Sequence, residues 1–216
     1  MFEVQAHRSN SAAALQAYLP AGPDSLELDV GVLEDGTPVV SHEVRATTLE
    51  CPAGSPLLGT PWRELTAEDA RALGRLTLDD ALAIAGATPL VVEAKVYPPE
   101  TVSSRAFADA LEPYLDRISL ISFDEAVLGH ARARRRTLAT TFLFDEPVRV
   151  AAGPTTLGPR ADLVTRELVD AAHSLGMRVV PWTVNDERDM RALIDLGVDG
   201  IGTDEPALLR SVLAAG

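Results

Sequence analysis

Short apolar segments alternate with longer segments of helical periodicity along almost the whole chain. The apolar segments cover residues 2–6, 25–30, 38–42, 90–96, 118–123, 137–144, 161–165, 177–184 and 199–204. The helical patterns lie between them, at residues 11–19, 66–72, 77–85, 103–115, 125–133, 166–175, 187–196 and 206–214. Alternation of strands with helices predicts an α/β fold built on a parallel sheet.

One of the nine apolar segments does not fit a parallel sheet. Residues 38–42 follow the strand at 25–30 after only about seven residues, which contain the turn signal Glu-Asp-Gly at 34–36, whereas a parallel crossover needs a dozen or more. We therefore predict an antiparallel hairpin arm there. The eight remaining strands predict a compact (β/α)₈ TIM barrel. We expect one domain over residues 1–216, with the Pro- and Gly-rich stretch 44–65 as a loop or small cap on one rim.

The chain is acidic, since 19 Lys and Arg residues stand against 32 Asp and Glu residues and the net charge is −13. This balance argues against a nucleic-acid-binding surface and against attraction to anionic membranes. The only cysteine is Cys51, which excludes an intrachain disulfide framework and suits a reducing compartment. No apolar run approaches the ~20 residues of a membrane span, and the N-terminus is too short and polar for a signal peptide. We expect a soluble cytoplasmic protein, unless a leader was removed.

Three acidic residues lie at the carboxyl ends of neighbouring predicted strands. Glu27 and Asp29 are two residues apart in one strand, and Glu93, with Lys95, lies towards the end of the strand at 90–96. Residues i and i+2 of a strand point to the same face, so the first two carboxylates crowd together. Such a set of oxygens suits Mg²⁺ or Ca²⁺. The alternative is that these acids pair with Arg8 and Lys95 or point to solvent.

Two of the four histidines also end apolar segments at this rim. His7 follows the first strand and His42 ends the hairpin arm. Because histidine titrates near neutral pH, both are candidates for general acid–base catalysis. His130 and His173 lie within helical patterns, where packing or solvation explains them.

Three further residues at the strand ends could bind a substrate. Lys95 could neutralise a phosphate oxygen as a point charge, and Arg8 could bind one through its planar guanidinium group. Trp182 either lines the substrate pocket or belongs to the core.

With these residues in view, the chain resembles the glycerophosphodiester phosphodiesterase family over nearly its whole length. The similar segments are AHR at 6–8, LELDV at 26–30, EDGTPVVSHE at 34–43, LTLDDAL at 76–82, VVEAK at 91–95, ISFD at 121–124, VVPWTVND at 179–186 and GVDGIGTDEP at 197–206. The resemblance implies a metal-dependent phosphodiesterase on a (β/α)₈ barrel that acts on a small phosphodiester. It also implies that Glu27, Asp29 and Glu93 hold the metal and that His7 and His42 act as acid and base.

The chain departs from the family pattern in ways that leave the substrate open. Ser9 replaces the usual glycine after His-Arg, the Pro-Glu-Asn-Thr segment is missing, and Glu43 follows His42 where Asp is usual. The short interval after His7 and the pattern His7-x-x-Asn10 resemble the related sphingomyelinase D and phospholipase D branch. Two alternatives therefore stand beside glycerophosphodiester hydrolysis. One is a lyase that forms a cyclic phosphate from lysophospholipids, and the other is a silent relative that binds a phosphorylated ligand.

Overall fold

The computed structural model describes residues 2–48, 51, 54–151 and 153–215. The strands are β1 (Glu3–Ala6), β2 (Ser25–Val32), β3 (Pro38–Val40), β4 (Leu90–Ala94), β5 (Ile118–Ser122), β6 (Thr140–Phe144), β7 (Thr156–Pro159), β8 (Arg178–Val179) and β9 (Gly200–Thr203). The α-helices are α1 (Ala12–Tyr18), α2 (Ala67–Ala72), α3 (Leu78–Ala85), α4 (Ser104–Leu111), α5 (Glu125–Arg134), α6 (Arg166–Ser174), α7 (Glu187–Asp195) and α8 (Pro206–Ala214). Short 3₁₀ helices are η1 (Leu19–Ala21), η2 (Trp62–Glu64), η3 (Glu112–Tyr114) and η4 (Ala161–Leu163).

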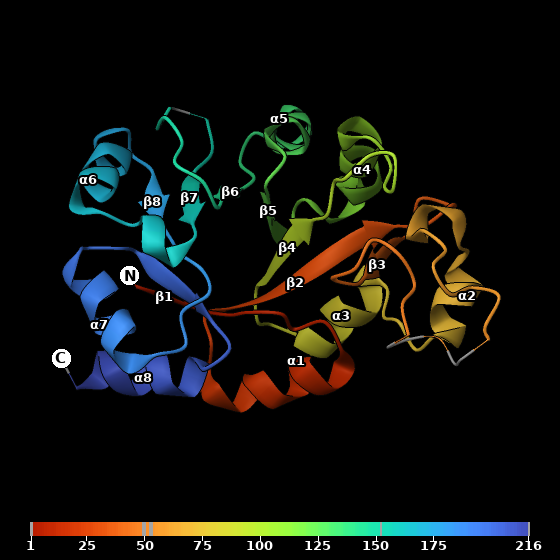
Figure 1. The fold of residues 1–216 in the computed structure, drawn as a ribbon, viewed down its shortest axis with the longest axis horizontal. Coiled ribbons are helices and arrows are strands. Elements are labelled where there is room, and N and C mark those ends of the chain that lie inside the picture. Colours follow the sequence, from red (N-terminus) through yellow and green to blue (C-terminus); the bar gives the residue numbers. More distant parts are fainter. Residues whose placement is uncertain (1, 49–50, 52–53, 152, 216) are drawn as a thin grey trace.

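Eight parallel strands form a nearly closed barrel, and the helices surround it (Figure 1). The strand order is β8-β7-β6-β5-β4-β2-β1-β9. The two end strands approach each other through backbone hydrogen bonds from Asp199 N to Val179 O (2.8 Å) and from Gly202 N to Pro181 O (2.9 Å). The predicted (β/α)₈ barrel is therefore confirmed.

The one strand that lies outside the barrel order, β3, is the predicted hairpin arm. β3 pairs antiparallel with the second half of β2, with Val30 opposite Val40, and Gly36 adopts a left-handed φ of 85° in the turn between them. After β3 the chain makes an excursion that contains η2 and α2 before it reaches α3. A separate small core holds this excursion against the hairpin, and its buried members are Leu33, Val39, Ala46, Cys51, Trp62, Leu65 and Ala70. Residues 49–50 and 52–53 of the predicted loop lie outside the described residues.

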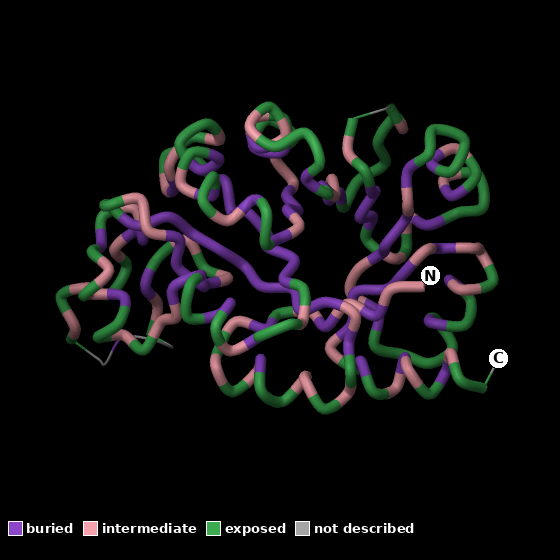
Figure 2. The backbone as a smooth tube through the Cα atoms, turned by 180° about the vertical axis from the view of Figure 1, so that it is seen from behind, coloured by how far each residue is buried: buried purple, intermediate pink, exposed green. Residues whose placement is uncertain are grey.

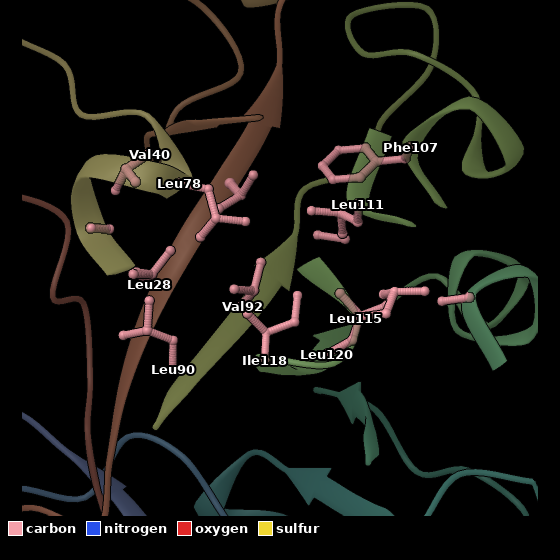
Figure 3. Close-up of a cluster of buried hydrophobic side chains, with 14 of the residues drawn as sticks. Leu28, Val40, Leu78, Leu90, Val92, Phe107, Leu111, Leu115, Ile118 and Leu120 are labelled. Carbon is pink, nitrogen blue, oxygen red and sulfur yellow. The ribbon is translucent and has the colours of Figure 1, made fainter. Parts of the chain in front are cut away.

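The main core of the first half lies between the barrel wall and the surrounding helices. Leu28 of β2, Val92 of β4 and Leu120 of β5 pack outward against α3 and α4, which contribute Leu78 and Phe107 (Figure 3). The tube in Figure 2 shows the same division, with buried strands inside and exposed outer helix faces. Because neighbouring strand residues point to opposite faces, the residues on either side of an outward Leu28 point into the barrel.

One predicted strand was wrong. The sequence pattern placed a strand at residues 161–165, but this segment begins with η4, and the barrel strand is β7. β7 has the sequence TLGP. Glycine and proline are residue types that occur rarely within strands. A Cβ on Gly158 would lie 2.6 Å from Leu143 Cδ2 of the adjacent strand. A side chain at this position would have to displace Leu143 and Thr141, so glycine allows the close packing, and a hydrophobicity pattern does not reveal this.

Candidate active site

The three acidic residues meet inside the carboxyl end of the barrel. Asp29 of β2 is the direct neighbour of Glu93 of β4 in the parallel register, and Glu27 lies two residues earlier on the same face as Asp29. Each offers an oxygen within 4.8 Å of the others. All three side chains are buried, with relative exposures of 2%, 2% and 8% for Glu27, Asp29 and Glu93. The alternative in which they point to solvent is therefore wrong.

The alternative of ion pairing holds only in part. Lys95 Nζ lies 2.8 Å from Asp29 Oδ1 and 2.7 Å from Glu93 Oε1. Arg8 donates its backbone N–H, not its guanidinium group, to Glu27 Oε2 (2.7 Å). One ammonium group thus pairs with two of the three carboxylates, and ionisation of all three acids would leave an excess of negative charge.

Burial and mutual repulsion shift the acidity of these groups. Desolvation, together with the charges of Asp29 and Glu93, raises the pKa of Glu27 well above its usual range. Desolvation also raises the pKa of Glu93 to about 7, although the Lys95 ammonium opposes the shift. Burial acts in the same direction on Asp29, but the Lys95 ammonium and hydrogen bonds from Lys95 and Asn10 outweigh it and hold the pKa of Asp29 below its usual value.

This donor set fits a divalent cation. The oxygens are hard ligands of the kind that Mg²⁺ and Ca²⁺ prefer. Among the described residues Glu27 Oε1 is buried and has no hydrogen-bond partner, and a buried oxygen of this kind is unfavourable unless something binds it. A cation bound by Glu27, Asp29 and Glu93 would satisfy that oxygen and reduce the repulsion between the acids.

His7 is held by a carboxylate that comes from the far end of the chain. Its Nδ1 lies 2.9 Å from Asp204 Oδ1. Asn185 donates to the other oxygen of Asp204 (2.7 Å) and accepts from the Asp204 backbone N–H (2.8 Å). Burial lowers the pKa of His7, although Asp204 opposes this shift. A neutral imidazole with its proton on Nδ1 matches this arrangement and leaves Nε2 as an acceptor.

His42 has a similar partner on its own segment. Its Nδ1 lies 2.8 Å from Glu43 Oε1, and its Nε2 lies 3.0 Å from Arg8 Nη2. Arginine can only donate, so Nε2 is the acceptor and Nδ1 donates to Glu43. Glu43, which departs from the usual aspartate of the family pattern, still reaches the imidazole.

Arg8 connects the histidines to the acids through an uncommon backbone conformation. Its φ is 54°, in the left-handed region that a residue other than glycine seldom adopts. In this conformation the N–H groups of Arg8 and Ser9 donate to the Oε2 and backbone oxygens of Glu27, both at 2.7 Å, while the guanidinium group reaches His42. We interpret the strained backbone as part of the geometry of the site.

The eight residues that the sequence analysis singled out line one pocket of about 280 Å³. They are His7, Arg8, Glu27, Asp29, His42, Glu93, Lys95 and Trp182. Trp182 is half-buried, meets Phe123 edge to face with ring centroids 5.5 Å apart, and donates to Gly158 O (2.7 Å). It contributes both to the pocket wall and to a small apolar cluster. His130 and His173 do not belong to the lining, and His173 pairs with Asp199 instead.

The pocket continues into the barrel interior. Its lining includes Glu3 at the start of β1 as well as His7 just after its end. Four residues of a strand correspond to roughly 13 Å along the strand. A polar contact lies at the deep end, where Arg178 Nη1 pairs with Glu3 Oε2 (2.8 Å).

Three supporting contacts were not predicted from the sequence. Asp204 and Asn185 were visible only as polar residues at strand ends. The contact of Asp204 with His7 spans almost the whole chain, and Asn185 bonds to Asp204, not to His7. Asn10 was noted in a family pattern but not in a role. Its Nδ2 donates to Asp29 Oδ2 (2.6 Å), and its Oδ1 accepts from Asp29 N (2.8 Å). The repeated position of polar residues after strands was the only available signal for these partners.

The two hydrogen bonds of Asn10 yield a stability prediction. Asn10→Ala leaves a buried carboxylate oxygen and a backbone N–H of Asp29 without these partners, so the free energy of unfolding should fall by about 1–3 kcal/mol. Urea denaturation in the presence of a chelator measures this change. Gln16→Ala, at an exposed position of α1, should stay within about 0.5 kcal/mol of the wild type. Equal stability of the two variants would contradict a structural role for Asn10.

Comparisons with known proteins agree with this fold and show the family. The model of the glycerophosphoryl diester phosphodiesterase family matches residues 4–208. A glycerophosphodiester phosphodiesterase of Caldanaerobacter subterraneus is 26% identical over 96% of this chain and 93% of its own length. The crystal structure of a glycerophosphodiester phosphodiesterase from Parabacteroides distasonis superposes with a TM-score of 0.81 and 23% identity, covering 99% of this chain and 97% of that one. A phosphodiesterase from Oleispira antarctica, solved with the product sn-glycerol-3-phosphate, superposes with a TM-score of 0.78 and 19% identity. The match covers 97% of this chain and 96% of that one.

None of the helices in the described ranges combines the length and the apolar character that crossing a bilayer requires.

Proposed function

Since the chain belongs to the glycerophosphoryl diester phosphodiesterase family of phosphoric diester hydrolases, we propose that it hydrolyses glycerophosphodiesters to an alcohol and glycerol phosphate. The observation that carries this proposal is the single pocket in which three buried carboxylates lie beside two carboxylate-anchored histidines. Family membership supports the use of a divalent cation, and its assignment to Mg²⁺ or Ca²⁺ is part of the proposal.

The proposed metal ligands are Glu27, Asp29 and Glu93. A bound cation supplies charge stabilisation to a phosphate oxygen in the transition state. The buried Lys95 ammonium neutralises part of the remaining negative charge on Asp29 and Glu93. We assign Lys95, Arg8 and Trp182 to the binding of the diester, because each of them lines the pocket.

The proposed acid and base are His7 and His42. Each imidazole has a carboxylate at Nδ1, which orients the ring and fixes the proton on that nitrogen. His7 Nε2 is then available for proton transfer, and His42 Nε2 becomes available when the Arg8 guanidinium turns from it to the phosphate. One Nε2 accepts the proton of the attacking hydroxyl, and the other, when protonated, donates to the leaving alcohol. The attacking hydroxyl belongs either to water or to the substrate, and the second route gives a cyclic phosphate first.

Two further predictions accompany this proposal. We propose that residues 1–216 form one domain, because all nine strands of the described residues belong to one sheet. A cytoplasmic location stays a prediction and rests on the presence of a single cysteine.

A matrix of metals and substrates tests the proposal. Protein treated with a chelator is supplied with Mg²⁺, Ca²⁺ or no metal and assayed with glycerophosphocholine and lysophosphatidylcholine, and ³¹P NMR distinguishes cyclic from linear phosphate products. We expect metal-dependent formation of glycerol phosphate from glycerophosphocholine. A cyclic product formed preferentially from the lysophospholipid would favour the lyase alternative. Thermal stabilisation by both diesters without any product over days would contradict hydrolysis and favour the binding protein.

A further inference from the structure

We propose that Trp62, in the excursion between β3 and α3, is a positioning residue that fixes His42 for catalysis. The part of this proposal that concerns catalysis rests on the function proposed above. Trp62 does not line the pocket, so it acts through the segment that carries His42.

The indole N–H is bound to the two residues that flank His42. Trp62 Nε1 donates to the backbone oxygen of Glu43 (2.6 Å) and to Ser41 Oγ (3.1 Å). Ser41 Oγ in turn donates to the same Glu43 oxygen (3.0 Å). Residues 41–43 therefore form a short arch with His42 at its centre, and the indole N–H of Trp62 is hydrogen-bonded to both of its ends.

The indole is itself fixed by close packing. Trp62 is 1% exposed, and its backbone N–H donates to Val44 O (3.1 Å). Its ring lies over Gly31 of β2, where a Cβ would be 3.6 Å from Trp62 Cδ1. This is an ordinary van der Waals distance, so the indole packs directly against the strand that also carries Asp29.

The arch is connected to the same strand from its other side. Ser41 donates its backbone N–H to Asp29 O (2.9 Å). Trp62 and Ser41 thus link the His42 segment to β2 at two points, next to a proposed metal ligand. Catalysis depends on placing the reacting groups to within a fraction of an ångström. The indole holds both ends of the arch and therefore determines the position of His42 relative to the acids.

A purely structural role would require only that Trp62 fill space. Trp62→Phe keeps an aromatic ring in the small core but removes the N–H, so it separates the two roles. Leu65→Ala is the matched control, because Leu65 belongs to the same small core and is 2% exposed. No hydrogen bond in the described part of the chain joins its side chain to residues 41–43.

The experiment combines kinetics with thermal stability and imidazole NMR. Trp62→Phe should lower kcat by roughly 10-fold or more, with KM and the thermal shift caused by Mg²⁺ close to wild type. Leu65→Ala should lower the melting temperature but retain kcat at a temperature where it is folded. In long-range ¹H–¹⁵N spectra, assigned with His42→Ala, wild-type His42 should show the Nδ1–H tautomer, and Trp62→Phe should change this signal but not that of His7.

Distinct results would overturn the inference. Wild-type kcat and an unchanged His42 signal in Trp62→Phe, or an equal loss of kcat in Leu65→Ala, would reduce Trp62 to a packing residue. Should Trp62→Phe not fold, Ser41→Ala removes one acceptor of the same arch and must change kcat and the His42 signal in the same direction. A wild-type protein that turns over no diester would contradict the proposed function alone, because the NMR comparison still reports how His42 is positioned.

Discussion

Glu27→Gln is expected to lower diester turnover by about 10²-fold or more and to abolish the stabilisation by the cation. The substitution removes one of the three proposed metal ligands and keeps the shape of the side chain. A ligand at 100 times its Kd stabilises a protein by about 2.7 kcal/mol. For a chain of 216 residues, each kcal/mol corresponds to ~2–4 °C. Wild-type protein with saturating Mg²⁺ should therefore melt roughly 5–10 °C higher than with a chelator, and the variant should show little of this shift.

In the absence of metal, Glu27→Gln should not destabilise the protein. Desolvation and the charges of Asp29 and Glu93 disfavour the ionised form of Glu27, so a neutral amide should leave the metal-free protein at least as stable as wild type. Calorimetry with and without a chelator measures both effects. Glu68→Gln makes the same chemical change at an exposed position of α2 and should alter neither. A variant that retains the full metal-dependent shift would remove Glu27 from the set of ligands.

The part of the site that the sequence predicted depends on local rules. Glu27 and Asp29 share a face because side chains alternate along a strand, and Glu93 joins them because neighbouring parallel strands present their carboxyl ends at the same rim. The hairpin arm followed from a connection too short for a crossover. For the pair Glu27 and Asp29 and for the hairpin arm, a few consecutive residues contained the whole signal. Glu93 required in addition only the alternation of strands and helices that predicts the barrel.

The parts that sequence analysis missed depend on contacts between distant residues. Asp204 meets His7 only because β9 lies beside β1 in the closed barrel. Trp62 reaches the His42 segment from a stretch that was predicted only as a loop or cap. The sequence pattern misplaced β7 because the glycine at 158 reflects close packing against Leu143 of the adjacent strand. A pattern read along one strand contains no information about that neighbour.

His7→Ala and His42→Ala are each expected to lower kcat for glycerophosphocholine by about 10²-fold or more. Neither should weaken the thermal shift by Mg²⁺, because the three acids remain in place. His130→Ala serves as the control, since His130 lies on α5 and does not line the pocket. Wild-type turnover in either active-site variant would exclude that histidine from the acid–base pair.

A change of leaving group then separates the two roles. The acid histidine protonates the departing alcohol, but p-nitrophenolate is stable enough to leave without a proton. With a p-nitrophenyl diester, the variant that lacks the acid should recover most of its turnover, and the variant that lacks the base should not. The structure already distinguishes the two sites, because the side chain of His7 is 18% exposed and that of His42 is 39% exposed. Equal recovery by both variants, or by neither, would contradict a division of labour between the histidines and would require another proton donor for the leaving group.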